Sequence, residues 1–313
     1  MAMTQAAFSQ LVDEAVSAVM FERYGSVPSL IPVFFDVRDS DRYREKSGEI
    51  GSLGLFDEFG SPYGGSGGGG GGTVAEDTAT QQYAKSFVHR EYAKKISVQR
   101  KWIDDQDFVT LRDLGSQLGL AAARTREQHG LRVFDFAFQT RSEGEYQAPD
   151  GLALCANAHT TPTSSKTWDN LGTGALTAAN VTAAVEAMRD YTDDRDLPIS
   201  TVPDMLVVPD ELEEEAFEII ASAGKVDTAN NNRNVHNGRY QLVVIQGTFL
   251  SDANNWFLID SMAMRQALIW YDRVPLELAD DGNLSTQSRS LYAYMRYSLG
   301  FTDWRWVYGS QVA

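Results

Sequence analysis

A run of glycine broken by a single serine, from Gly64 to Gly72, limits what this part of the chain can fold into. Each glycine loses more backbone entropy on ordering than any other residue and offers no side chain to a core, so the run cannot belong to a packed layer. Its flanks, residues 47–59 and 74–96, are therefore predicted to form the two sides of a long excursion with glycine at its tip. An engineered linker would have the same composition.

These glycines do not indicate a phosphate-binding loop. A P-loop ends in Gly-Lys-Ser or Gly-Lys-Thr at the start of a helix and follows a strand. No lysine lies between Lys46 and Lys85, and no strand pattern precedes the run. Nucleotide binding is not expected here.

Length and net charge limit the classes of protein to which the chain can belong. The chain has 313 residues, of which 43% are hydrophobic, enough for one large or two medium domains. Its 43 acidic and 27 basic residues give a net charge of −16, which repels phosphate and argues against sequence-specific DNA binding. Such a surface favours solubility, and it would also suit a container wall past which packaged DNA slides. Neither a membrane-spanning run nor a signal-peptide pattern is present, so a cytoplasmic product is expected.

The strongest local pattern is a helix over residues 104–132, with Asp104 and Asp105 as its expected N-terminal cap. At 1.5 Å per residue this helix would be roughly 40 Å long. Gly115 and Gly119, four residues apart, predict that another backbone approaches closely on one face. The apolar stripe consists of Phe108, Leu111, Leu114, Leu118, Ala121, Ala122 and Thr125.

The remaining segments predict an α+β fold. Residues 1–45 begin as a helix and continue as an extended arm over 28–37. Residues 151–261 alternate helix and strand patterns, with a helix capped by Thr177 and another begun by Asp210 and Glu213. Residues 267–274 and 290–308 have the period-two alternation of β-strands, with Trp304 and Trp306 among the aromatics.

No motif for catalysis or metal binding is found. The four histidines lack metal-ligand spacing, and the acidic clusters lack the order of a calcium loop. The single cysteine, Cys155, cannot form an internal disulfide and is expected to be a buried, inert thiol. A soluble hydrolase that uses Cys155 and His159 is the alternative from another class, and it predicts a small oligomer inactivated by Cys155→Ala. Otherwise we expect no catalytic residue, no metal and no cofactor.

The order of several segments between Phe87 and Tyr308 resembles the major head subunit of Mu-like phages, a branch of the HK-97-like tailed-phage capsid fold. The resemblance depends on the helix from Asp104 and Asp105 to the Ala-Ala-Ala-Arg-Thr sequence at 121–125, and on Asp-Gly-Leu-Ala-Leu-Cys-Ala-Asn-Ala-His at 150–159. Segments 176–188, 203–211, 256–260 and 303–306 support it.

This resemblance implies an HK-97-like arrangement of four parts. They are an N-terminal arm (1–45), an extended loop with a glycine-rich tip (46–86), a peripheral domain with a long spine helix (87–149 and 262–313), and an axial domain (150–261). The terminal aromatic strands are expected to pack on the phenylalanine-rich end of the long helix, around Phe134.

The implied function is self-assembly into the hexamers and pentamers of an icosahedral shell that encloses a double-stranded DNA genome. Portal, scaffolding and decoration proteins are implied partners, DNA is touched only non-specifically, and no membrane is involved. The loop and the segment 224–238, which would reach toward the capsomer axis, supply the candidate assembly contacts: Phe56, Phe59, Tyr63, Gly64, Gly72, Asn230, Arg233 and Asn234.

Some relatives reinforce the shell with a lysine-to-asparagine isopeptide bond from the extended loop. Residues 47–84 contain no lysine, so we expect no cross-link from this tip, and a mass-spectrometric ladder of linked subunits would contradict this. An encapsulin-like compartment with the same fold and a tail or decoration protein are the alternatives. A neighbouring portal, protease or terminase gene would favour the phage over the compartment.

Overall fold

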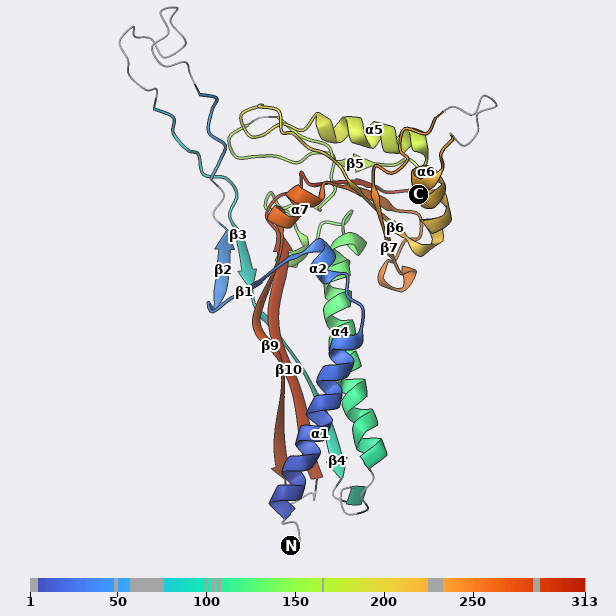
Figure 1. Cartoon of the computed structure of the whole chain (residues 1–313). Coiled ribbons are helices and arrows are strands. Elements are labelled where there is room, and N and C mark those ends of the chain that lie inside the picture. Colours follow the sequence, from blue (N-terminus) through green and yellow to red (C-terminus); the bar gives the residue numbers. More distant parts are fainter. Residues whose placement is uncertain are drawn as a thin grey trace, which may run out of the picture.

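The computed structural model describes residues 5–47, 50–56, 76–99, 101–102, 105, 108–164, 166–224, 233–283 and 288–312. Two sheets organise these residues (Figure 1). The first, which we call the long sheet, has the strand order β1-β9-β10-β4, and the second has five strands in the order β5-β11-β8-β6-β7. The expected α+β class is therefore observed.

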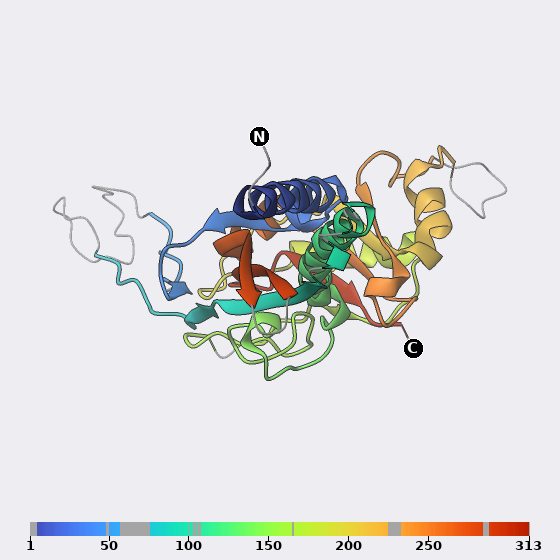
Figure 2. The same cartoon turned by 90° about the horizontal axis from the view of Figure 1, so that it is seen from below.

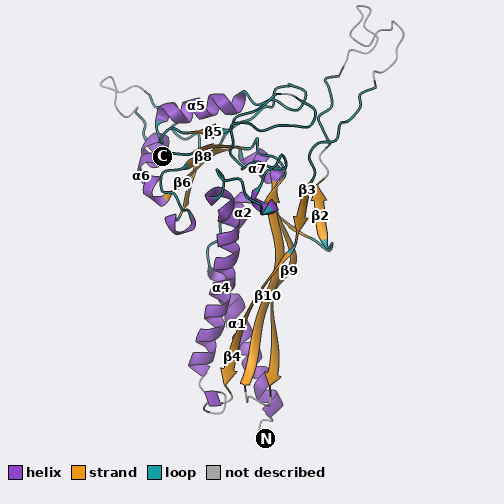
Figure 3. Cartoon of the chain, turned by 180° about the vertical axis from the view of Figure 1, so that it is seen from behind, coloured by secondary structure: helices purple, strands orange, loops and turns teal. Residues whose placement is uncertain are grey.

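The long sheet is built on an antiparallel hairpin of β9 (Leu268–Asn283) and β10 (Ser288–Phe301). Strand β4 (Arg90–Gln99) pairs antiparallel with β10, and β1 (Asp36–Asp39) pairs parallel with β9. Helices α1 (Gln5–Ser26) and α4 (Phe108–Asp135) run along these strands (Figures 2 and 3). Apolar side chains from both helices and two strands meet in a buried cluster of Val16, Val98, Leu111 and Leu291.

Helix α4 is the predicted long helix, shifted toward the C-terminus. It begins at Phe108, so Asp105 is not its N-cap, and Asp104 lies outside the described residues. The predicted close approach is confirmed, because α1 crosses α4 at both glycines. A Cβ atom on Gly115 would lie 3.0 Å from the carbonyl oxygen of Val16, and one on Gly119 would collide with that of Met20.

The N-terminal segment packs on its own chain. The extended arm expected over 28–37 is wrong in part, since residues Ile31–Phe34 form the short helix α2 before β1. Phe34 contacts Phe134 with ring centroids 4.7 Å apart, and Phe35 contacts Trp270 at 5.6 Å. Burial of these rings explains why the segment turns back onto the body.

The five-stranded sheet contains the strands predicted in the middle of the chain. They are β6 (Met205–Pro209), β7 (Gln241–Ile245) and β8 (Trp256–Ile259), joined by β5 (Leu171–Gly172) and β11 (Val307–Ser310). All of β6 and β8 is buried. Short 3-10 turns lie at Gly144–Tyr146 (η1) and Gly247–Phe249 (η3).

Two helices pack against this sheet, and a third leads from β8 into β9 of the long sheet. The first, α5 (Ala178–Arg189), is capped as predicted, because the Thr177 hydroxyl accepts the Asn180 N–H at 3.2 Å. A 3-10 turn, η2 (Asp210–Leu212), precedes α6 (Glu213–Ala221), and the expected capping box is wrong: the Asp210 carboxylate accepts the N–H of Gly247 instead. Asp260 caps α7 (Ser261–Ala267) through the N–H groups of residues 262 and 263.

The β structure predicted over 290–308 is confirmed, but it is divided between two strands. Strand β10 ends at Phe301, because the Asp303 carboxylate accepts the N–H groups of Trp304 and Arg305 and turns the chain. The last strand, β11, then joins the five-stranded sheet beside β8. The segment 262–313, expected in one domain, is thus shared between both sheets. Phe134 lies edge-on to Trp306 at 6.5 Å, as predicted for the end of the long helix.

His129 on α4 gives the fold a predicted pH dependence. Burial, and the nearby positive charges of Arg132 and Arg90, lower the pKa of His129 from 6.5 to about 4. The unfolded chain therefore binds a proton here between these values while the folded chain does not. The free energy of unfolding should fall as pH drops through this window, by about 1–2 kcal/mol after discounting for partial exposure.

The measurement is the urea midpoint of the subunit at about pH 7 and about pH 4.5, for the original chain and for His129→Gln. The variant should lose less stability between the two pH values. Equal losses in the two proteins would contradict the assignment.

Candidate assembly site

The long excursion predicted from the sequence begins as a two-stranded ribbon. Strand β2 (Arg44–Ser47) pairs antiparallel with β3 (Lys85–Val88), and Ile50 bridges to Gln81 further out. This ribbon and the segments 50–56 and 76–84 project away from the rest of the molecule (Figure 1). We call residues 50–56 and 76–82 the loop base. The glycine-rich tip lies outside the described residues.

Asp194 fastens both sides of the loop base to the body of the subunit. One carboxylate oxygen accepts the N–H of Ser52 at 3.1 Å, and the other accepts the side-chain amide of Gln82 at 2.8 Å. Burial alone would raise the pKa of Asp194, but hydrogen bonds from Ser52 and Thr163 outweigh it and the pKa is lowered. A Cβ atom on Gly51 would collide with the Thr80 hydroxyl and the Asp194 carboxylate, so a side chain there would have to displace these groups.

Arg195 forms a second fastening next to the first. Its guanidinium lies 2.9 Å from the Asp77 carboxylate and donates to the carbonyl of Thr78 at 3.0 Å. Asp77 also accepts the N–H of Gly54 at 2.6 Å. Because the two fastenings come from adjacent residues, a single turn between α5 and β6 holds both sides of the loop base.

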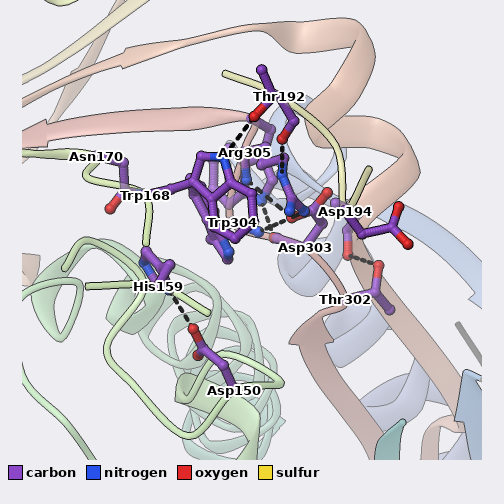
Figure 4. Close-up of polar contacts among 12 residues, drawn as sticks. Asp150, His159, Trp168, Asn170, Thr192, Asp194, Thr302, Asp303, Trp304 and Arg305 are labelled. Atoms are coloured by element: carbon purple, nitrogen blue, oxygen red, sulfur yellow. Dashed lines mark hydrogen bonds and ion pairs between the residues drawn. The ribbon is translucent and has the colours of Figure 1, made fainter. Parts of the chain in front are cut away.

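The body beneath this turn is a stack of aromatic and charged groups (Figure 4). The His159 ring lies parallel to Trp304 with centroids 4.3 Å apart, and the Arg305 guanidinium lies 4.8 Å from the Trp304 ring. His159 Nδ1 is 2.7 Å from the Asp150 carboxylate, and both side chains are almost fully buried. A cavity of about 220 Å³ separates the stack from the loop base.

Cys155 and His159 do not form the pair that a hydrolase would need. The two ring nitrogens of His159 face the Asp150 carboxylate and the carbonyl of Leu154, at 2.7 and 3.2 Å. The Cys155 thiol is buried against Gly309, and burial raises its pKa far above the ordinary value. A thiol held in its neutral form is a poor nucleophile. The predicted burial of this thiol is confirmed.

The outgoing side of the loop base carries apolar side chains that the subunit leaves uncovered. Leu53 is 60% exposed, Leu55 78% and Phe56 fully exposed. Adjacent exposed apolar residues of this kind are typical of surfaces that contact other proteins. Phe56 was singled out from the sequence, whereas Leu53 and Leu55 were missed, although their position beside Phe56 in an extended segment was a usable signal.

The other residues predicted as assembly contacts differ in whether the structure describes them and in whether they are exposed. Phe59, Tyr63, Gly64, Gly72 and Asn230 lie outside the described residues. Arg233 is exposed. Asn234 is buried: its amide donates to the carbonyls of Ile219 and Ser222, so it holds the segment together inside the subunit.

Two further apolar residues are exposed near the segment 225–232 in sequence. Phe217 on α6 and Val235 are 61% and 62% exposed, on either side of the segment 225–232 in sequence. In the described part of the chain, no group of three His, Cys, Asp or Glu side chains could hold a metal ion. No helix among the described residues has the length and apolar character to cross a membrane.

Asp194→Ala should release the loop base without unfolding the subunit. Loss of the hydrogen bonds to a charged acceptor, each worth about 1.5–3 kcal/mol, should speed amide exchange over 50–56 and 76–82 roughly tenfold or more. Hydrogen-exchange mass spectrometry measures this. Asp190→Ala is the matched control, because its exposed side chain makes no hydrogen bond or ion pair within the described residues. Unchanged exchange in Asp194→Ala would show that Asp194 does not fasten the loop.

Comparison with known proteins connects this geometry to a family. A family model described as phage capsid protein matches residues 82–310. No curated protein matches the chain by sequence.

Solved structures share the fold at low sequence identity. A chain from Microbacterium phage Oxtober96 is 12% identical, with 92% of each chain covered and a TM-score of 0.59. A chain from Mycobacterium phage Adephagia is 14% identical, with 92% of this chain and 91% of that one covered and a TM-score of 0.55. The capsid of bacteriophage JBD30 decorated with minor capsid protein trimers contains a chain 14% identical, covering 72% of this chain and 92% of its own, with a TM-score of 0.53. The expected HK-97-like capsid fold is confirmed, and the narrower Mu-like resemblance stays a prediction.

Proposed function

The chain belongs to the phage capsid protein family, and on that premise we propose that it is the shell-building subunit of a tailed double-stranded DNA phage. Copies would associate into hexamers and pentamers and close an icosahedral shell around the genome. Assembly would take place in the host cytoplasm.

One observation carries the proposal: the apolar residues Leu53, Leu55 and Phe56 stay exposed on a loop base that is fastened to the body of the subunit. Leaving such residues in water is unfavourable by about 1.5–3 kcal/mol for each side chain that could be buried. A neighbouring copy that covers them recovers this free energy. The fastening by Asp194 and Arg195 keeps the segment in position for that contact.

We propose no catalytic role for the subunit. Its one thiol is buried and neutral, and His159 is engaged by Asp150 and Leu154. The net charge of −16 supports only non-specific contact with packaged DNA. Portal and scaffolding proteins are proposed partners, and the decorated JBD30 capsid supports a decoration protein as another.

Mass measurement of the purified chain after size-exclusion chromatography tests the proposal. We expect capsomers at five and six times the 34.6 kDa subunit mass, together with closed shells. A chain that stays monomeric at all concentrations, alone and when co-expressed with the scaffolding protein of its own phage, would contradict shell building. An encapsulin-like compartment would instead form shells that retain a cargo enzyme.

A further inference from the structure

The chain changes its strand partner at His89. Strand β4, which begins directly after this residue, pairs with β10 of the long sheet, whereas β3, which ends directly before it, pairs with β2 of the ribbon. On the other side of the ribbon Ser40 has the equivalent place, directly after β1 and before β2. We call His89 and Ser40 the joint of the ribbon. The place where the ribbon leaves the long sheet can be followed in Figure 1.

The His89 ring ties both sides of the joint to the long sheet. The residue is only 5% exposed. Its Nε2 atom lies 3.2 Å from the Ser40 hydroxyl oxygen, and its Nδ1 atom lies 3.0 Å from the hydroxyl oxygen of Ser298 on β10. One imidazole ring therefore connects the start of β2, the end of β3 and the middle of the molecule's longest hairpin.

The hydrogen bonds of the joint are satisfied by a neutral His89 ring. The Ser40 hydroxyl donates to the Glu45 carboxylate at 2.8 Å, so its oxygen accepts the proton of His89 Nε2. His89 Nδ1 then carries no proton and accepts the Ser298 hydroxyl. A second ring proton, on Nδ1, would occupy the place of the Ser298 hydroxyl proton and break this arrangement.

The surroundings of His89 also disfavour a charged ring. Three charged side chains act on it, Glu45 on β2, Arg296 on β10 and Arg273 on β9, and the Tyr271 ring meets it edge-on with centroids 6.4 Å apart. Burial, and after it the positive charge of Arg296, lower the pKa of His89 below its ordinary value of 6.5. Glu45 acts in the opposite direction and offsets only part of this effect.

We propose that the joint is a pH-sensitive hinge, which neutral His89 keeps closed and which proton uptake by this ring opens. An open joint exposes the ring to water, where it binds a proton at the ordinary pKa of about 6.5. The stability of the closed joint is therefore complete above that pH and decreases as the pH falls below it. The hinge acts at the inner end of the ribbon, whereas Asp194 and Arg195 fasten the loop base farther out. It belongs to the single subunit and does not depend on shell assembly.

Amide hydrogen exchange of the unassembled full chain tests the hinge. Exchange is measured at about pH 7.5 and about pH 5, and each rate is divided by the intrinsic chemical rate at that pH to give the degree of opening. His89→Gln keeps a neutral side chain that donates and accepts hydrogen bonds but does not titrate. His129→Gln is the matched control, because it removes another histidine of lowered pKa, whose ring contacts Tyr92 and Tyr297.

In the original chain and in His129→Gln, the opening of residues 40–47 and 83–89 should increase several-fold at the lower pH, with an upper limit of about thirtyfold if the closed joint binds no proton. His89→Gln should open equally at both pH values. An acid effect in His89→Gln as large as in the original chain would overturn the proposal. If His89→Gln fails to fold, nuclear magnetic resonance titration of the histidine rings in the original chain decides. Titration of His89 below the ordinary value of about 6.5 would support the hinge, and titration at or above it would overturn the hinge.

Discussion

Replacing Gly119 with alanine should lower the free energy of unfolding of the subunit by about 1–3 kcal/mol, although alanine favours helix by about 1 kcal/mol over glycine. The added Cβ would collide with the carbonyl oxygen of Met20 and lie 3.2 Å from the backbone nitrogen of Tyr24. Backbone atoms of a packed helix cannot rotate away as a side chain can. Helix α1 must therefore shift off α4 and loosen the packing of Val16 and Met20, which are both buried.

Urea unfolding of the unassembled subunit measures this effect. Gly25→Ala is the matched control, because it lies in the last turn of α1 and a Cβ atom there meets nothing within 4 Å. The control should be as stable as the original chain or slightly more so. If Gly119→Ala unfolded at the same or a higher urea concentration than the original chain, the close crossing of α1 and α4 would be wrong.

The double substitution Leu55→Ser and Phe56→Ser should abolish most shell formation and leave the subunit folded. Each side chain contributes about 1.5–3 kcal/mol when it is buried by a neighbour, so every loop contact would lose up to roughly 3–6 kcal/mol. This loss is repeated at every subunit of a capsomer. In the isolated chain both side chains are exposed, so their removal costs the fold little.

Gradient sedimentation gives the fraction of protein in particles, and circular dichroism verifies the fold. Val109→Ser, at an equally exposed apolar residue on α4, is the control and should assemble nearly as well as the original chain. Normal assembly of the double variant would mean that the loop contributes no apolar contact between subunits.

Local patterns predicted much of this fold. The long helix, the Thr177 cap and the strands near 205–208 and 256–260 follow from periodicity and capping, which depend on neighbours in sequence. The paired glycines on α4 even predicted a contact with a distant segment, because two glycines four residues apart in a helix have few other uses.

The features that the sequence did not predict depend on contacts between residues far apart in the chain. The period-two aromatics of 290–308 predicted β structure but not the break within it, where the Asp303 carboxylate accepts the N–H groups of Trp304 and Arg305 and the chain turns. Asp194 carries no pattern that distinguishes it from its acidic neighbours. Its role arises only because Ser52 and Gln82, more than a hundred residues away in sequence, are brought to it by the fold.

Cryo-electron microscopy of particles made by the full chain tests the central claim most directly. We expect closed shells of hexamers and pentamers in which residues 53–56 of each subunit are buried against the next copy. Particles whose subunits meet through other surfaces, with Leu53, Leu55 and Phe56 still open to solvent, would contradict it.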